Sequence, residues 1–401
     1  MTGANPPPPV LCPICRSSSI LLLLEIDQLP VHCHLLWPTR EGAIRIKRGD
    51  MRLCFCRQCS HTFNAVFQPE KMAYTQDYDN SLHFSKRFQA YALGLAERLV
   101  QRYDLCGKNI VEIGSGKGDF LATLCALGDN RGVGFDPSSP PSGTADGRVH
   151  FVRDCYSERY ANYPADIIVA RHVLEHVADP MGLLSTVRRA INGRRNTVVF
   201  AEVPNALFTL GELGIWDLIY EHCSYFTSRS LEEAFRRTGF DVLHQSEEFG
   251  GQFLTIEALP GDTPLQREET QAMQWAQDMR AADAALAAGE FGKNYRRKVH
   301  TWKRQLSNMA AESQRVVVWG AGSKGITFLN VLDTRGVIEY VVDVNPRKVG
   351  MHVAGTGQEI IAPESLVTYQ PDVVIIMNTE YVEEIKTELR NLGLEPRVML
   401  A

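Results

Sequence analysis

Asn-Ile-Val-Glu-Ile-Gly-Ser-Gly-Lys-Gly-Asp-Phe-Leu, residues 109–121, is the segment from which the architecture of this chain is best worked out. A short apolar, β-prone run leads into three glycines at alternate positions, and a helical pattern follows them. This order predicts a strand, a tight turn and a helix start. Glycine has no Cβ, so the turn can lie close against a ligand, and an acid at the strand end adds an acceptor. The candidate ligand-binding residues here are Glu112, Gly114, Gly116 and Gly118.

Further short strands are predicted at residues 132–136, 149–154 and 165–170, and each leads into polar residues. The first ends in Asp136, at the distance where α/β nucleotide folds hold a ribose diol. The polar residues at the ends of the other two are Asp154, Cys155, His172 and His176. Polar residues in register at four strand ends indicate one ligand site along an α/β sheet.

Length and composition restrict the class of protein. A chain of 401 residues is too long for one ordinary core and indicates two or three domains. Its 44% hydrophobic and 22% charged residues are typical of a soluble globular protein. A net charge of -5 offers no basic field for nucleic acid or an anionic membrane. The start lacks a secretory signal and no long apolar run follows, so we expect a cytoplasmic protein without a membrane partner.

The ten cysteines of a cytoplasmic chain stay reduced, so closely spaced pairs point to metal before disulfides. Two Cys-x-x-Cys knuckles, at residues 12–15 and 56–59, can supply a closed tetrahedral shell of four thiolates for a structural Zn²⁺. Cys54 competes for one ligand position and Cys33 can also be recruited, although only Cys56 gives the two-residue spacing. The predicted metal ligands are Cys12, Cys15, Cys56 and Cys59.

Two later segments carry further signals. Residues 220–227 read Tyr-Glu-His-Cys-Ser-Tyr-Phe-Thr, a polar and aromatic cluster that neither a buried helix nor a buried strand needs. Residues 266–307 read as one or two linking helices. Beyond them the chain restarts as an α/β unit with a Gly-x-Gly-x-x-Gly turn at residues 320–325, too short for a complete dinucleotide site.

Taken together, these motifs resemble those of the three-domain S-adenosylmethionine-dependent C-methyltransferases of deoxysugar biosynthesis. The resemblance covers essentially the whole chain. It implies an α/β protein in which a class I, Rossmann-like methyltransferase domain is flanked by a small N-terminal zinc-binding domain and a C-terminal Rossmann-like domain. The expected boundaries are 1–71 for the zinc-binding domain, 72–262 for the methyltransferase domain, 263–310 for the linking helices and 311–401 for the C-terminal, substrate-binding domain.

The resemblance also assigns roles to residues. The glycine turn would bind S-adenosylmethionine, Asp136 its ribose hydroxyls, and Asp154 with Cys155 its adenine. The remaining cofactor-binding candidates are His172 of the His-x-Leu-Glu-His signature and Tyr78 with Ser81, in the segment that closes over the methionine end. The catalytic candidates are His222 as base, Glu221 as its assistant in proton transfer, Tyr220 as hydroxyl donor and His176 as a second polar group.

Two departures from the family pattern leave the acceptor open. Residues 28–43 differ from the corresponding segment of the sugar enzymes, and Gly250-Gly251-Gln252 replaces the usual Gly-Gly-Ser. We expect a small-molecule acceptor, methylated at carbon next to a carbonyl as in a nucleotide-linked ketosugar. The alternatives are O-methylation of a carboxylate or hydroxyl in secondary metabolism, and a non-catalytic binding protein. We expect a monomer or weak homodimer that binds no nucleic acid.

Overall fold

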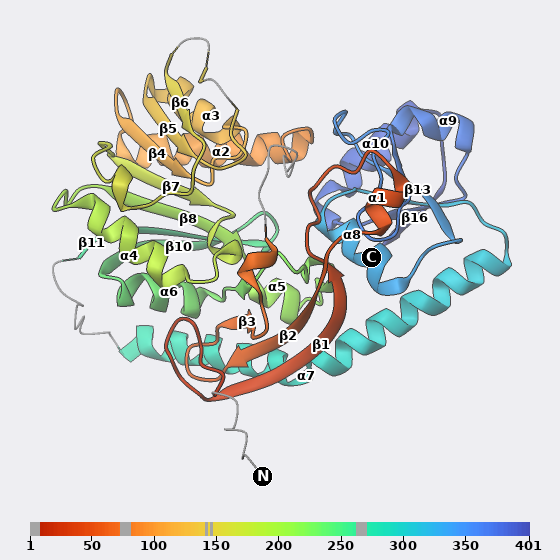
Figure 1. Ribbon diagram of the computed structural model, residues 1–401, viewed down its shortest axis with the longest axis horizontal. Coiled ribbons are helices and arrows are strands. Elements are labelled where there is room, and N and C mark those ends of the chain that lie inside the picture. The colour runs from red at the N-terminus through yellow and green to blue at the C-terminus, as the bar shows by residue number, and fades with distance from the viewer. Residues whose placement is uncertain (1–8, 73–81, 141–142, 145–146, 262–270) are drawn as a thin grey trace.

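The computed structural model describes residues 9–72, 82–140, 143–144, 147–261 and 271–401, with residues 271–281 described in backbone only. Three sheets and one long helix organise this part of the chain (Figure 1). Each sheet grows from a segment with its own hydrophobic pattern, and the three come together around shared cores.

The central unit is a seven-stranded sheet in the order β10-β11-β8-β7-β4-β5-β6. The strands from β8 to β6 run parallel, whereas β11 is antiparallel to both of its neighbours. The strands are β4 (Asn109–Ile113), β5 (Arg131–Phe135), β6 (Val149–Val152), β7 (Ile167–Arg171), β8 (Val198–Pro204), β10 (Phe240–Glu248) and β11 (Phe253–Pro260). This sheet confirms the class I methyltransferase fold expected from the sequence.

Helices cover both faces of the central sheet, because β4 and β7 are apolar on both sides and must be buried twice. The helices are α2 (Lys86–Tyr103), α3 (Asp119–Gly128), α4 (Pro180–Ile191), α5 (Ala206–Leu210) and α6 (Ser228–Arg237). Single 3₁₀ turns complete the unit at η2 (Glu158–Tyr160), η3 (Leu174–His176) and η4 (Ile215–Asp217).

The N-terminal unit is a four-stranded antiparallel sheet in the order β1-β2-β3-β9. Its elements are β1 (Ile20–Pro30), α1 (Arg40–Ile44), β2 (Arg48–Cys56), β3 (Thr62–Asn64) and η1 (Pro69–Lys71). The fourth strand, β9 (Ser224–Tyr225), belongs to the central part of the chain. The sheet therefore reaches past the predicted boundary at residue 71 and includes the residues that follow His222.

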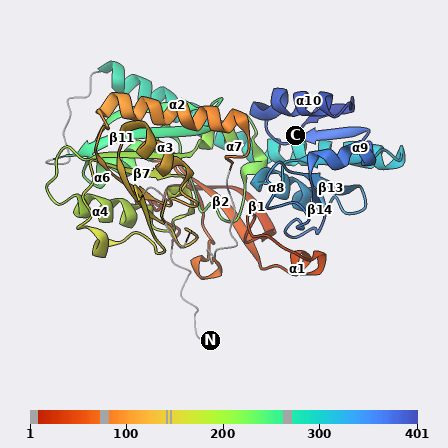
Figure 2. The same ribbon diagram turned by 90° about the horizontal axis from the view of Figure 1, so that it is seen from above.

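One helix, α7 (Gln271–Ala311), forms where the sequence indicated one or two linking helices. It runs from the central unit to the C-terminal unit along one side of the molecule (Figures 1 and 2). None of the helices in the described part of the chain has the apolar length that a membrane crossing requires.

The C-terminal unit is a five-stranded parallel sheet in the order β14-β13-β12-β15-β16. Its strands are β12 (Val316–Trp319), β13 (Ile338–Val342), β14 (Glu359–Ile361), β15 (Val373–Ile376) and β16 (Arg397–Leu400). Its helices are α8 (Ser323–Leu332), η5 (Pro363–Ser365), α9 (Leu366–Tyr369), η6 (Thr379–Tyr381) and α10 (Val382–Asn391). One hydrophobic core joins this sheet through Ile375, α7 through Trp302 and the N-terminal sheet through Phe55.

Candidate active site

The glycine turn between β4 and α3 leaves Gly116 facing open space. Gly116 has a φ of +52°, and a Cβ built on it would meet nothing within 4 Å. A Cβ on Gly114, by contrast, would collide with the side chain of Val173. Packing therefore explains the first glycine, whereas Gly116 borders a space that a ligand can fill.

Asp136, at the end of β5, is fixed beside this turn. Its Oδ2 accepts the N–H of Gly116 at 3.0 Å, and its Oδ1 accepts the N–H of Ser138 at 2.6 Å. Oδ1 also accepts the hydroxyl of Ser138 at 2.7 Å, so Oδ2 is the oxygen that can accept a further hydroxyl. This arrangement fits the predicted role of Asp136 toward a ribose diol.

Glu112 lies deeper than the turn. The side chain is 3% exposed, and burial raises the pKa of Glu112 to about 8. Its Oε2 has no hydrogen-bond partner within the described ranges. A carboxyl group of this kind is protonated near neutral pH and can donate one hydrogen bond.

Asp154 and Cys155, predicted to contact adenine, lie just beyond the end of β6. Asp154 accepts the hydroxyl of Tyr160 at 2.6 Å and the N–H of Cys155 at 2.8 Å, and it also pairs with Arg159. Cys155 is exposed. The two residues of the closing segment, Tyr78 and Ser81, lie outside the described residues.

His172 joins a buried row of charges at the ends of β7 and β8. Its Nε2 lies 3.0 Å from Oε1 of Glu202, which also accepts from Arg171 at 2.8 Å and, through Oε2, from Tyr91. On the other side, Nδ1 of His172 lies 3.3 Å from Oε1 of Glu175. Burial favours the neutral ring, but the hydrogen bonds and charges of the two glutamates outweigh it and raise the pKa of His172 to about 9.

Four residues of this row were not predicted as site residues: Glu175, Glu202, Arg171 and Tyr91. Glu202 lies in β8, opposite Arg171 of β7, and the signal for Arg171 is that it directly precedes His172 in the sequence. Tyr91 lies on α2, 111 residues before Glu202, and no local pattern indicates that contact.

The structure brings His176 and His222 together. Their ring centroids are 4.8 Å apart in an edge-to-face arrangement, and His222 is only 9% exposed. Burial, and then the neighbouring charge of His176, lower the pKa of His222 well below its ordinary value. Nδ1 of His176 lies 3.2 Å from the carbonyl oxygen of Glu221, and because a carbonyl only accepts, this nitrogen carries the proton. Because its pKa is lowered, His222 is a neutral imidazole, which is the form that can accept a proton.

The other two predicted catalytic side chains contact the N-terminal unit. The hydroxyl of Tyr220 accepts the N–H of Gln68 at 3.0 Å, and its ring covers Gly49 of β2. Oε1 of Glu221 accepts the N–H of Cys33 at 2.5 Å. Of the four catalytic candidates, His176 and His222 have side chains that lie together in the described structure, whereas Tyr220 and Glu221 bind the N-terminal unit.

Two family models match the chain. Residues 67–245 match the model described as a methyltransferase domain, and residues 250–394 match the model described as a C-methyltransferase C-terminal domain. The protein is an S-adenosylmethionine-dependent methyltransferase. No curated protein sequence matches it.

Several solved structures resemble part of the chain. One is the 1,6-didemethyltoxoflavin-N1-methyltransferase of Burkholderia thailandensis, 16% identical, covering 51% of this chain and 97% of that one with a TM-score of 0.34. Another is the magnesium protoporphyrin IX methyltransferase of Synechocystis, 16% identical, covering 44% of this chain and 84% of that one with a TM-score of 0.34. A third is the pyocyanin biosynthetic protein PhzM, 17% identical, covering 43% of this chain and 55% of that one with a TM-score of 0.33.

The methyltransferase carries its four predicted metal ligands in one cluster. The sulfur atoms of Cys12 and Cys59 are 3.5 Å apart, as are those of Cys15 and Cys56, and all four lie within 4.8 Å of one another. Four thiolates at such spacing fit a tetrahedral Zn²⁺ and leave no position for substrate. The two alternatives considered above, Cys54 and Cys33, are not part of this cluster.

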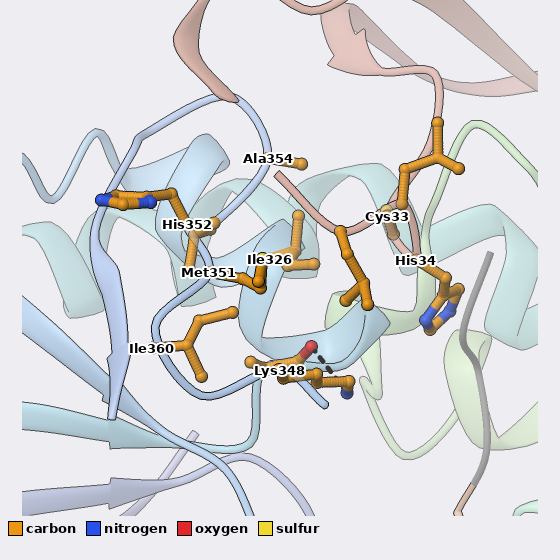
Figure 3. Close-up of a pocket in the computed structure, with 12 residues that line it drawn as sticks. Cys33, His34, Ile326, Lys348, Met351, His352, Ala354 and Ile360 are labelled. Carbon is orange, nitrogen blue, oxygen red and sulfur yellow. Dashed lines mark hydrogen bonds between the residues drawn. The ribbon is translucent and has the colours of Figure 1, made fainter. Parts of the chain in front are cut away.

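The C-terminal glycine turn of the methyltransferase repeats the geometry of the first but is closed. Oδ2 of Asp343 accepts the N–H of Ala321 at 2.9 Å, as Asp136 accepts from the first turn. Lys348 then donates to the same Oδ2 at 3.1 Å and to the carbonyl oxygen of Ala321 at 3.0 Å. Figure 3 shows Lys348 at the edge of a pocket formed with Cys33 and neighbouring residues of the N-terminal unit. Lys348 therefore already binds the carboxylate that, in dinucleotide-binding folds, accepts the ribose hydroxyl.

Gln252, one of the departures from the family pattern, lies at the junction of two units. It is 3% exposed, and its amide exchanges hydrogen bonds of 2.8 and 2.9 Å with Asn378 of the C-terminal unit. Lys324 donates to its Oε1 at 2.6 Å and lies 3.2 Å from Asp217. The junction beside α8 is therefore polar and already hydrogen-bonded.

Proposed function

We propose that this methyltransferase methylates a carbon next to a carbonyl in a small molecule, with a nucleotide-linked ketosugar as the model acceptor. The observation that carries the proposal is the buried, neutral His222 packed against His176. The match of residues 250–394 to a C-methyltransferase C-terminal domain supports carbon as the methylated atom.

The chemistry needs a base and an electrophile. When bound, S-adenosylmethionine supplies a methyl group that is already electrophilic, so the protein must align the acceptor with it. His222 removes the proton from the acceptor carbon, and the C–H electron pair passes into an enolate that takes the methyl group. The proton stays on His222 until it leaves to solvent. Burial of His222 keeps water from competing for the base.

The remaining residues divide into cofactor and structural roles in this proposal. Asp136 and the space beside Gly116 take the cofactor. Glu221 assists by holding the loop at Cys33, and the C-terminal domain holds the acceptor. We place the protein in the cytoplasm, because its paired cysteines fit metal and not disulfides. We propose that it is a monomer or weak homodimer.

A second candidate is O-methylation of a carboxylate on a small secondary metabolite. It is favoured by Gln252 and Lys324, which place an amide and a cation at the junction between the central and C-terminal units. A carboxylate is ionised without a base, so His222 would then orient the acceptor and not deprotonate it.

Methyl-labelled S-adenosylmethionine, incubated with a panel of nucleotide-linked 4-ketosugars and small carboxylic acids, tests these proposals. We expect label on a ketosugar in a form that survives mild alkali, because a C–C bond forms. Label that alkali releases as methanol would identify an ester and replace carbon methylation by the second candidate. The Gly116→Val protein, in which a side chain enters the cofactor space, is the negative control.

A further inference from the structure

Glu221 stands next to His222 in the sequence, yet its carboxylate is engaged elsewhere. The side chain is fully buried, and its Oε1 holds the N–H of Cys33 at 2.5 Å. Its backbone carbonyl lies 3.2 Å from Nδ1 of His176. The Glu221 carboxylate therefore accepts a hydrogen bond from a loop of the N-terminal unit, although the sequence places it next to His222.

A different carboxylate lies beside the histidine pair. Glu175 is 1% exposed, and one of its oxygens lies within 4.8 Å of a ring nitrogen of His176 and of His222. Its Oε2 has no hydrogen-bond partner among the residues that the structure describes. Its backbone carbonyl accepts the N–H of Cys223 at 2.9 Å, which ties η3 to the chain directly after His222. This backbone hydrogen bond fixes the position of Glu175 relative to His222.

The charge of Glu175 is balanced from its other side. His172 lies between the carboxylates of Glu175 and Glu202, at 3.3 and 3.0 Å, and Arg171 donates to Glu202 at 2.8 Å. These groups form a buried row in which cations and anions alternate, so their charges cancel. A positive charge that arises on His222 lies at the anionic end of this row.

We propose that Glu175 is the positioning residue that stabilises the protonated form of His222 while the acceptor loses its proton, a role that rests on the function proposed above. The proton passes from the acceptor carbon to a ring nitrogen of His222, and Glu175 neither gives nor takes it. The other titratable groups that face His222 are His34 of the N-terminal loop, His172, His176 and Tyr225 of β9. Glu175 is the carboxylate that lies beside these groups, and an opposite charge at this range favours the charged imidazole.

The test uses full-length, zinc-loaded protein saturated with S-adenosylhomocysteine and labelled with ¹⁵N in its imidazoles. The signals of His222 are assigned by their loss in His222→Asn, and their shifts are followed over a pH titration. Glu175→Gln should lower the pH at which His222 becomes protonated by about one unit or more. Glu175→Asp keeps the charge but withdraws it by one methylene, so its effect should be smaller.

The matched control is Glu257→Gln. Glu257 is a similarly buried carboxylate, 4% exposed, on β11 of the central sheet, where it pairs with Arg102 and Tyr103. Its substitution should leave the His222 titration unchanged. A shift of equal size in the control would mean that the response reflects loosened packing and would overturn the proposal.

Two other results would also overturn it. One is an identical His222 spectrum in wild type and both Glu175 variants from about pH 5 to about pH 9, whether or not the ring titrates. The other is a second bound metal beyond the cysteine site that is lost in Glu175→Gln, because Glu175, His176 and His222 would then be its ligands. The measurement needs no acceptor, so a Glu175-dependent shift would stand even if the acceptor panel contradicted carbon methylation.

Discussion

The open space at Gly116 makes a prediction about the cofactor at the scale of one residue. Gly116→Val should abolish S-adenosylmethionine binding, because a β-branched side chain enters that space and the φ of +52° disfavours it. Isothermal titration calorimetry measures the affinity. Gly193→Val is the matched control, since Gly193 also has a positive φ, +81°, and open surroundings but lies in the turn after α4. Unchanged affinity in Gly116→Val would place the cofactor site elsewhere.

His222 separates carbon from oxygen chemistry. If the acceptor is a carbon acid, His222→Asn should reduce turnover by roughly 10²- to 10⁴-fold, because general-base catalysis is lost. Cofactor affinity should stay nearly unchanged. His244→Asn, on the exposed part of β10, serves as the control. A His222→Asn enzyme with normal turnover at saturating acceptor would remove His222 as the base and favour methylation of a carboxylate.

His172 predicts a pH dependence of stability. Its pKa in the folded protein, about 9, is above the ordinary value of 6.5, so the folded state binds the proton more tightly. This contribution is complete below about pH 6.5 and is lost as pH rises toward 9, at roughly 1.4 kcal/mol per pH unit at most. Thermal unfolding midpoints should therefore fall over this range in wild type and fall less in His172→Gln. Parallel curves for the two proteins would contradict the ion pairs described here.

At the scale of elements, the cysteine cluster links the N-terminal knuckles to the central sheet. Cys12, Cys56 and Cys59 share a hydrophobic core with Phe226 and Phe235, so the metal holds a surface that the central unit packs against. Metal binding supplies folding free energy to such a small unit. Loss of the metal should therefore destabilise the packing of this unit against the central unit.

We predict one Zn²⁺ per chain and a less stable protein in Cys15→Ser. Elemental analysis should return well under one zinc for the variant, with a lower unfolding midpoint. Cys106→Ser, which changes an exposed cysteine outside the cluster, should keep the zinc content and the unfolding midpoint of the wild type. Retention of metal and fold by Cys15→Ser would rule out the four-cysteine assignment.

At the scale of the whole molecule, the C-terminal unit caps a helix of the central unit. Glu384 of α10 accepts the hydroxyl of Ser85 at 2.6 Å and the N–H of Lys86 at 2.8 Å, at the first residues of α2. Figure 2 shows α2 and α10 on the same side of the molecule. A carboxylate at a helix N-terminus accepts hydrogen bonds from unpaired N–H groups and interacts favourably with the positive end of the helix dipole.

Glu384→Gln should destabilise the docking of the two units by about 1–2 kcal/mol, because a charge-assisted bond at the cap becomes neutral. Chemical unfolding followed by separate probes in each unit measures the loss. Glu383→Gln is the control on the same helix, since the Glu383 side chain is 83% exposed. Equal stability of the two variants would show that the contact contributes nothing to docking.

Local pattern alone was enough to predict much of this protein. The strand, glycine turn and helix at residues 109–121 form as expected, because glycine spacing and apolar runs act within a few residues. The knuckles at residues 12–15 and 56–59 form one sulfur cluster, since two-residue spacing lets both thiolates face one ion.

Only the tertiary structure decided which side chains share the site. Neighbours in the sequence, Glu221 and His222, are separated in function because the N-terminal loop captures the Glu221 carboxylate at Cys33. Glu175, distant in the chain, takes the place beside His222 because η3 and the segment after His222 are joined by backbone hydrogen bonds. Spacing along the chain governs contacts within a turn or strand, whereas contacts between elements depend on how buried surfaces pack, which no short pattern encodes.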